Sequence, residues 1–223
     1  MKRVWLREIG DPAHNEDGSL FVRSELVHRA SLSLAHYATD GDRGRLEGDP
    51  VFEAVTEGRQ SSNTARRAKG SKEMAFSACA EMIHWGLANL GVADESLVNR
   101  DKDDWGQNPW KSQVAISRIF NHKAFTHNKP APPGSPIFVT AAEHVAILES
   151  WNADHITSFD YGQFNPKKGK FSGEKKVRAL KKAGRGWTIG GRPYVGYLDL
   201  TKLRYMRFAE VPEDFEGGLP IYD

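Results

Sequence analysis

Apolar residues recur every three to four positions in the first half of the chain and form short unbroken runs in the second half. The helical spacing predicts one amphipathic helix over residues 19–38, with Leu20, Val22, Leu26, Ala30, Leu34 and Tyr37 as its apolar positions. A second helix is predicted over residues 77–91, between a capping Ser77 and a terminating Gly91. Shorter helices are predicted over residues 50–57 and 109–120.

The pattern changes to β-type after a loop rich in proline, glycine, histidine and asparagine at residues 121–136. Residues 137–139, 145–148 and 156–161 are β-branched and aromatic runs divided by turn residues, which predicts consecutive antiparallel strands. A further hairpin is expected around Gly190 and Gly191, while residues 174–183 are compatible with either a helix or a strand. Helices followed by a meander predict the α+β class.

Length and composition narrow the classes of protein. A chain of 223 residues with 39% hydrophobic residues fits a single domain. One cysteine excludes an intrachain disulfide and a multi-cysteine zinc site, and no cofactor or metal is expected. The net charge of +2 argues against nucleic acid as a partner. We expect no membrane span and no Sec signal peptide, because the N-terminus has no apolar core and no run of 18 apolar residues occurs.

The single cysteine, Cys79, is the first candidate for chemistry. It falls in the first turn of the helix predicted over residues 77–91. Free backbone N–H groups and the helix dipole at that position lower the pKa of a thiol, and the N–H of Cys79 could also stabilise an oxyanion. The alternative is that Cys79 is only a small buried hydrophobic residue.

A thiol nucleophile needs a base and a group that orients the base. Of the eight histidines, His144 is the preferred base because it leads into a predicted strand after a proline-rich turn. Asp160, at the far end of the next strand, is the preferred orienting carboxylate. The rivals for this third position are Asp154, His155 and Ser158.

Substrate-binding candidates surround these three residues along the chain. A loop rich in tryptophan and asparagine follows the cysteine helix and suits a peptide or a sugar, although tryptophans are more often core residues. The candidates for binding substrate are Ser77, Trp105, Trp110, Tyr161 and Gln163.

The order of these motifs resembles that in the NlpC-type and CHAP (cysteine, histidine-dependent amidohydrolase/peptidase) members of the papain-like superfamily. The resemblance covers about residues 74–163: Ser-Ala-Cys-Ala on a helix, Pro-Gly-Ser-Pro before a strand, His-Val-Ala-Ile-Leu, then Ile-Thr-Ser-Phe-Asp. By position, Cys79 matches the nucleophile, His144 the base and Asp160 the third polar residue. Three departures are Ala78 before the cysteine, Ser135 in place of the family's aspartate, and Glu143 before the histidine.

The resemblance implies a papain-like core in which the nucleophile helix packs on an antiparallel sheet. Residues 71–223 would form this core and residues 1–70 an N-terminal helical extension. It also implies hydrolysis of amide bonds in peptidoglycan, by an endopeptidase or an amidase. Such an enzyme, made in the cytoplasm without a Sec signal, would reach the wall through lysis or a specialised secretion system. In the second case it is an antibacterial effector, and an immunity or inhibitor protein would be its partner.

Other functions remain open from the sequence. A protein protease, a deamidase or an acyltransferase could use the same residues, because all proceed through an acyl-enzyme. A catalytically inactive binding module of the same shape is a further alternative. In a third alternative, the basic residues between Lys167 and Arg185 bind a polyanion and Cys79 only packs. The reactivity of the thiol separates an enzyme that uses Cys79 from the inactive binding module and from the polyanion-binding protein.

Overall fold

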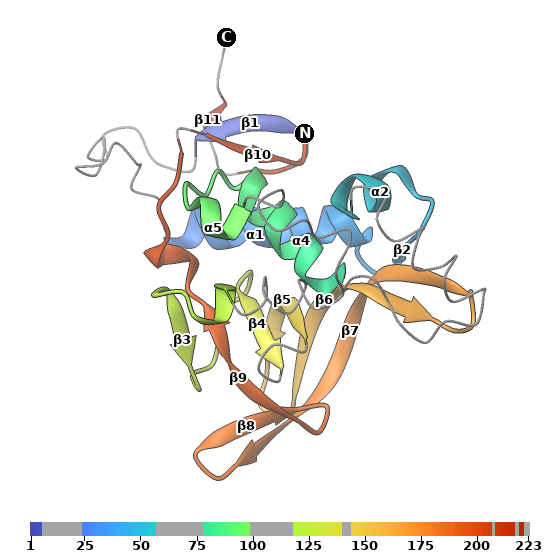
Figure 1. The fold of residues 1–223 in the computed structure, drawn as a ribbon, viewed down its shortest axis with the longest axis vertical. Coiled ribbons are helices and arrows are strands. Elements are labelled where there is room, and N and C mark those ends of the chain that lie inside the picture. The colour runs from blue at the N-terminus through green and yellow to red at the C-terminus, as the bar shows by residue number, and fades with distance from the viewer. Residues whose placement is uncertain are drawn as a thin grey trace.

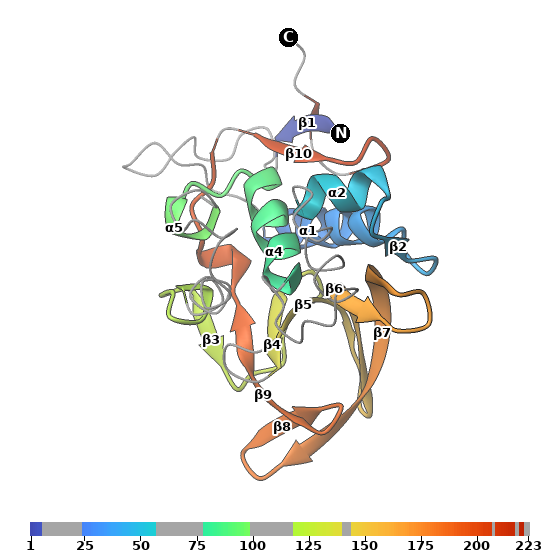
Figure 2. The same ribbon diagram turned by 45° about the vertical axis from the view of Figure 1, so that its right-hand side comes forward.

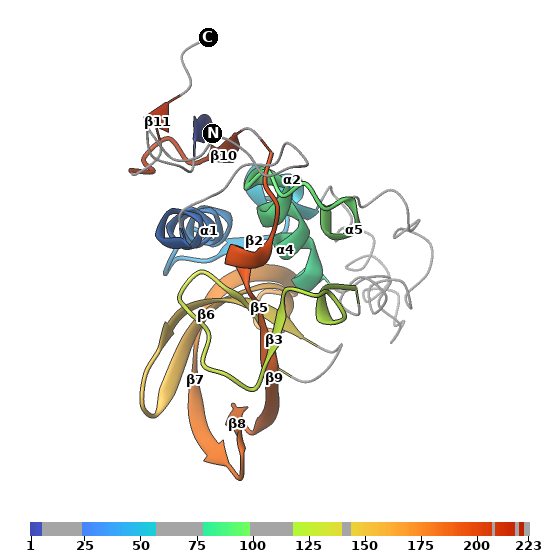
Figure 3. The ribbon, with the colours of Figure 1, turned by 90° about the vertical axis from the view of Figure 1, so that its left-hand side faces the viewer.

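The structure is a computed structural model that describes residues 1–5, 24–56, 78–98, 118–139, 144–206, 208–216 and 219–220. Its described elements stack in three levels (Figure 1). A layer of helices lies between a small three-stranded sheet and a larger β-structure, and the views from other sides show the same order (Figures 2 and 3).

The helical layer contains the helices that the apolar spacing predicts. Its members are α1 (Ser24–Thr39), α2 (Pro50–Thr56), α4 (Ala78–Asn89) and α5 (Glu95–Val98), with a short 3-10 helix, η2 (Leu200–Lys202), nearby. The first three confirm, within the described residues, the predictions over residues 19–38, 50–57 and 77–91. Most of the helix predicted over residues 109–120 lies outside the described residues, although residues 118–120 are helical.

The larger β-structure is a closed antiparallel barrel of six strands. These strands are β4 (Pro136–Val139), β5 (Val145–Trp151), β6 (His155–Asn165), β7 (Lys170–Ala183), β8 (Gly186–Ile189) and β9 (Arg192–Leu198). Each strand pairs with the next in this order, and β9 pairs back with β4. Two short strands, β2 (Arg45–Leu46) and β3 (Phe125–His127), extend it by pairing with β7 and β9.

The barrel corrects the predicted fold class. A papain-like α+β core, with the nucleophile helix on an antiparallel sheet, is wrong because the chain forms a closed six-stranded barrel and is mostly sheet. The strands predicted at residues 137–139, 145–148 and 156–161 are present as β4, β5 and β6. Strand β7 makes the closure possible because it pairs with both β6 and β8. It includes residues 174–183, for which the sequence was compatible with either a helix or a strand.

Alternation along the barrel strands produces two separate cores. In β4, Ile137 and Val139 face a core inside the barrel, whereas Phe138 faces a core shared with the helices. In β5, Ala146 and Leu148 likewise face the inner core, and their neighbours face the helices. Successive side chains of a strand point to opposite faces, so strands buried on both faces read as continuous apolar runs. The barrel strands are therefore enclosed on both sides near the helices.

The ends of the chain meet in the small sheet. Strand β1 (Lys2–Trp5) pairs with both β10 (Ala209–Val211) and β11 (Leu219–Pro220). Val4 of β1 and Val27 of α1 belong to the same buried cluster as the first turn of α4. The first 56 residues thus pack, where described, on the same core as the barrel strands, while the boundary near residue 70 stays a prediction. Among the described helices, none has the length and apolar character needed to cross a membrane.

Candidate active site

Helix α4 places Cys79 at the junction between the helices and the barrel. Cys79 is the second residue of α4, and its side chain is almost completely buried in the cluster that the helices share with the barrel. Helix α4 packs against α1, α2, β5 and β6. The first N–H groups of a helix have no carbonyl partner within that helix, so Cys79 lies at the end of α4 that carries partial positive charge.

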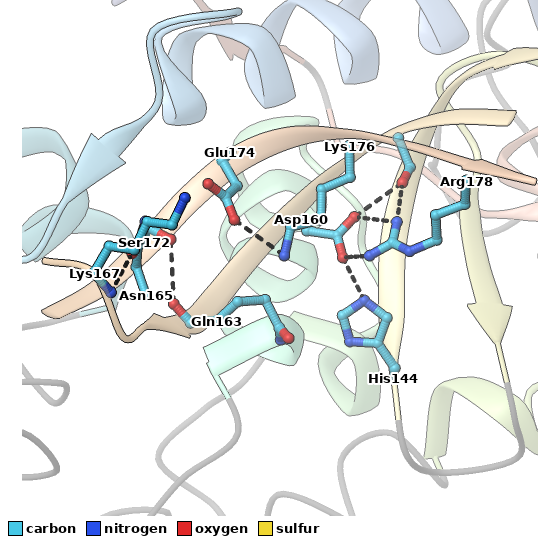
Figure 4. A network of polar contacts seen from close by, with 10 residues as sticks. His144, Asp160, Gln163, Asn165, Lys167, Ser172, Glu174, Lys176 and Arg178 are labelled. Atoms are coloured by element: carbon cyan, nitrogen blue, oxygen red, sulfur yellow. Dashed lines mark hydrogen bonds and ion pairs between the residues drawn. The ribbon is translucent and has the colours of Figure 1, made fainter. Parts of the chain in front are cut away.

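The register between β5 and β6 brings His144 and Asp160 together. Ile147 pairs with Phe159, so continuing the register by one residue sets Asp160 beside Ala146. His144 precedes Ala146 by two residues and therefore lies on the same face. Its Nε2 lies 2.7 Å from Oδ2 of Asp160, and Figure 4 shows the imidazole directed at this carboxylate.

His144 also contacts the thiol of Cys79. Because Nε2 is engaged by Asp160, the remaining ring nitrogen, Nδ1, is the one available to the thiol. Burial lowers the pKa of His144, but hydrogen bonds to Asp160 and to Cys79, together with the charges of both groups, outweigh it and raise that pKa to about 9. The structure thus brings together the three residues that the sequence predicted as nucleophile, base and orienting carboxylate, and His144 favours the protonated form at neutral pH.

Asp160 is held by three side chains. Its side chain is completely buried, and burial alone would raise the pKa of this carboxyl. Hydrogen bonds and charge interactions with His144 and Arg178 outweigh burial and hold the pKa far below its usual range. Ser158 Oγ donates a further hydrogen bond of 2.9 Å to Oδ1. These contacts favour the ionised form of Asp160 at neutral pH and hold its carboxylate in position.

The rivals for the third position lie elsewhere or act differently. Asp154 and His155 pair with each other, with Oδ1 2.6 Å from Nδ1; Asp154 is exposed in the turn after β5, and His155 is partly exposed at the start of β6. Ser158 touches the site only through Asp160 and Arg178. Among the four candidates for the third position, Asp160 is therefore the one that contacts His144.

The predicted substrate-binding residues have mixed outcomes. Ser77, Trp105 and Trp110 lie outside the described residues. Tyr161 is fully buried, and its ring stacks on Phe52 with centroids 4.8 Å apart, so it belongs to the core in this structure. Gln163 is partly exposed on β6, and its backbone carbonyl accepts a hydrogen bond from Ser172 Oγ at 3.2 Å. Only Gln163 among these candidates is described on the accessible surface.

Arg178 is the residue of the site that the sequence did not indicate. It lies on β7 opposite Ile156, on the face that carries Ser158 and Asp160. Its guanidinium forms a two-pronged contact with Asp160, and one of its two nitrogens contacts the carboxylate oxygen that also meets His144 (Figure 4). In the sequence Arg178 is one of many cations between Lys167 and Arg185, and only the strand register distinguishes it from the others.

Comparisons with family models, curated proteins and solved structures found no match for this chain. The resemblance to NlpC-type and CHAP proteins therefore rests on the sequence motifs alone. Within the described segments, no group of three or more histidine, cysteine, aspartate or glutamate side chains is arranged to hold a metal ion. What the site presents is a thiol, an imidazole and a carboxylate in series, which is the arrangement of nucleophilic acyl transfer.

Proposed function

We propose that this protein is a cysteine-dependent amide hydrolase that acts through Cys79, His144 and Asp160. The observation that carries the proposal is the continuous chain of contacts from the thiol of Cys79 through His144 to the buried carboxylate of Asp160. These residues come from α4, from the residue before β5, and from β6, so only the folded chain assembles them. Burying an ionised carboxylate costs free energy, and ionisable groups in such surroundings are concentrated at functional sites. The pairing of this carboxylate with a histidine that faces the only thiol therefore supports a catalytic role.

In the proposed reaction, the Cys79 thiolate attacks the carbonyl carbon of an amide, and a carbon–sulfur bond forms. The His144 imidazolium gives its Nδ1 proton to the leaving nitrogen as the carbon–nitrogen bond breaks, which leaves a thioester and neutral imidazole. Neutral His144 then takes a proton from water, and the resulting hydroxide attacks the thioester. The products are the carboxylic acid and regenerated Cys79, while Asp160 orients the imidazole throughout.

The substrate class follows from the motif resemblance and is also a proposal. Peptidoglycan stem peptides are the first substrate to test, with an endopeptidase or amidase activity. Delivery to the wall by lysis or by a secretion system, and inhibition by an immunity protein, belong to the same proposal. A protein protease, a deamidase or an acyltransferase would use the identical site, and the products distinguish them: new amino termini, ammonia, or a transferred acyl group.

The first test is the pH dependence of Cys79 alkylation by iodoacetamide in the native protein. We expect rapid modification at or below pH 7 and loss of this low-pH reactivity in a His144→Ala variant, because the imidazolium stabilises the thiolate. A His155→Ala variant is the matched control, since His155 also pairs with an aspartate but does so on the surface, at the start of β6. Slow alkylation that is equal in all three proteins and requires high pH would overturn the proposal.

The second test concerns the bond that is cleaved. Purified peptidoglycan and a protein substrate are each incubated with the wild type and with Cys79→Ala, and new amino groups, soluble sugars and ammonia are measured. Release of amino groups from peptidoglycan by the wild type only would support the wall as substrate. Ammonia from a protein substrate would assign a deamidase to the same three residues.

A further inference from the structure

Arg178 grips the buried carboxylate that orients His144. Nη1 donates hydrogen bonds of 2.9 Å to Oδ1 of Asp160 and of 2.8 Å to Oγ of Ser158. Nη2 contacts Oδ2, the oxygen that also meets His144. Two parallel N–H groups on one carboxylate fix both its position and its rotation, which a single point charge does not do. Oδ2 is consequently held facing the imidazole.

Burial makes the charge of Arg178 as important as its geometry. The Asp160 side chain has no exposed surface, whereas those of His144 and Arg178 are 12% and 20% exposed. When His144 gives up its proton, Asp160 loses one of its two positive partners but retains the other. Without Arg178, the same step would leave the buried carboxylate with neither of these two cations, and an ionised group that is buried without its partner is strongly destabilising.

The charged groups that face His144 can be named element by element. Cys79 faces it from α4, Asp160 from β6, and Arg178 approaches from β7 through the shared carboxylate oxygen. Lys176 and Glu174, the next charged residues on this face of β7, pair with each other at 3.0 Å. Among the described groups, Arg178 is thus the cation whose positive charge disfavours the protonated, positively charged form of His144.

We propose that Arg178 is a positioning residue for the proposed reaction: its two-pronged contact fixes Asp160 against His144, and its charge keeps Asp160 ionised while His144 passes its proton on. This inference rests on the proposed function for its catalytic meaning. The arrangement of Arg178, Asp160 and His144 can nevertheless be tested directly, because the protonation of His144 is measurable whether or not Cys79 reacts with any substrate.

The test is an NMR titration of the His144 imidazole in isotope-labelled protein, with the signal assigned by its loss in His144→Ala. In Arg178→Gln we expect the titration midpoint to rise by about one pH unit or more, a tenfold change in the ratio of imidazolium to imidazole, because a like charge has been removed. Arg192→Gln, which removes an exposed arginine on β9, is the matched control and should leave the midpoint unchanged. An unchanged or lower midpoint in folded Arg178→Gln overturns the proposal.

A conservative variant separates charge from geometry. Arg178→Lys keeps the positive charge and loses the fork, so the midpoint of His144 should stay near that of the wild type. The rate of iodoacetamide alkylation of Cys79 at pH 7 should fall severalfold, because Asp160 no longer holds the imidazole in one orientation. If Arg178→Gln does not fold, as judged by circular dichroism, this variant decides: alkylation at the wild-type rate would overturn the positioning role.

An absence of low-pH reactivity in the wild type itself would refute the proposed function and not the arrangement. In that case the His144 titration still reports whether Arg178 controls the protonation of the pair. A raised midpoint in Arg178→Gln together with an inert Cys79 would assign the three residues a structural use. The two failures are therefore distinguishable by experiment.

Discussion

Nε2 of His144 and Oδ2 of Asp160 lie 2.7 Å apart across the interface of two neighbouring barrel strands, at positions 16 residues apart in the chain. The hairpin between β5 and β6 sets this distance, because its register leaves both side chains on one face. The same face carries Ser158, and β7 adds Arg178 to it. Helix α4, in the helical layer, supplies the thiol of Cys79 that contacts His144. The candidate site is thus a product of strand register together with one helix terminus.

Replacement of Asp160 by asparagine should lower the pKa of His144. The substitution keeps the shape of the side chain and removes the charge that, with its hydrogen bond, raises this pKa to about 9. We expect the titration midpoint of His144 to fall by one pH unit or more and the alkylation of Cys79 at pH 7 to slow by about tenfold or more.

Asp154→Asn provides the matched control for that experiment. Asp154 also pairs with a histidine, His155, but its side chain is 87% exposed and lies in the turn between β5 and β6. This variant should leave both the His144 midpoint and the reactivity of Cys79 unchanged. Equal effects of the two substitutions would mean that Asp160 has no specific link to His144.

The stability of the protein should depend on pH through His144. Its folded pKa of about 9 lies above the ordinary value of 6.5, so the folded state binds the proton more tightly than the unfolded state does. The stabilisation is complete below about pH 6.5 and is lost as the pH rises through 9. Its size is on the order of 3 kcal/mol, since each pKa unit corresponds to about 1.4 kcal/mol.

Urea unfolding at several pH values measures this contribution. The free energy of unfolding of the wild type should exceed that of His144→Gln by most at pH 6, and the difference should shrink by pH 10. A difference that grows with pH would contradict the assigned direction of the shift. His155→Gln, which removes a surface pair at the start of β6, should show little pH-dependent difference from the wild type because surface ion pairs contribute little.

The sequence predicted those parts of the site that depend on local patterns, and it missed those that depend on pairing between distant segments. The apolar patterns of the helix that carries Cys79, of the strand that follows His144 and of the strand that carries Asp160 are local, so the sequence predicted all three. The sequence did not predict the barrel, because its closure depends on β7. The cations and single apolar positions of residues 174–183 show no clear helical or strand periodicity. Arg178 was missed for the same reason, since its partner is set by the register between β6 and β7.

Gly173 and Gly86 should respond in opposite directions to substitution by alanine. A Cβ on Gly173, in β7, would lie 2.3 Å from Cε2 of Tyr161, whose ring is fully buried against Phe52. Gly173→Ala should therefore lower the free energy of unfolding by about 1–3 kcal/mol, the usual cost of overpacking a core. The measurement is urea unfolding at neutral pH.

Gly86 is the matched control because it lies inside helix α4, and an added Cβ would meet no atom within 4 Å beyond its chain neighbours and the backbone of its own helix. Alanine has the higher helix propensity, so Gly86→Ala should raise the free energy of unfolding by up to about 1 kcal/mol. A stabilising effect of Gly173→Ala would show that the ring of Tyr161 can move aside, and would contradict the close packing of β6 against β7 at this point.

The hydroxyl of Tyr161 should be dispensable for stability and for catalysis. This oxygen is buried and has no hydrogen-bond partner among the described residues, and burial raises the pKa of the phenol. Removing an unsatisfied buried hydroxyl relieves its desolvation cost, so Tyr161→Phe should leave the free energy of unfolding equal or higher by up to about 1 kcal/mol. Tyr161→Ala should instead lower it by several kcal/mol through the cavity it leaves beside Phe52. Activity of Tyr161→Phe on whichever amide substrate the wild type cleaves should be unchanged. A rise in KM would instead support the prediction from the sequence that Tyr161 binds substrate.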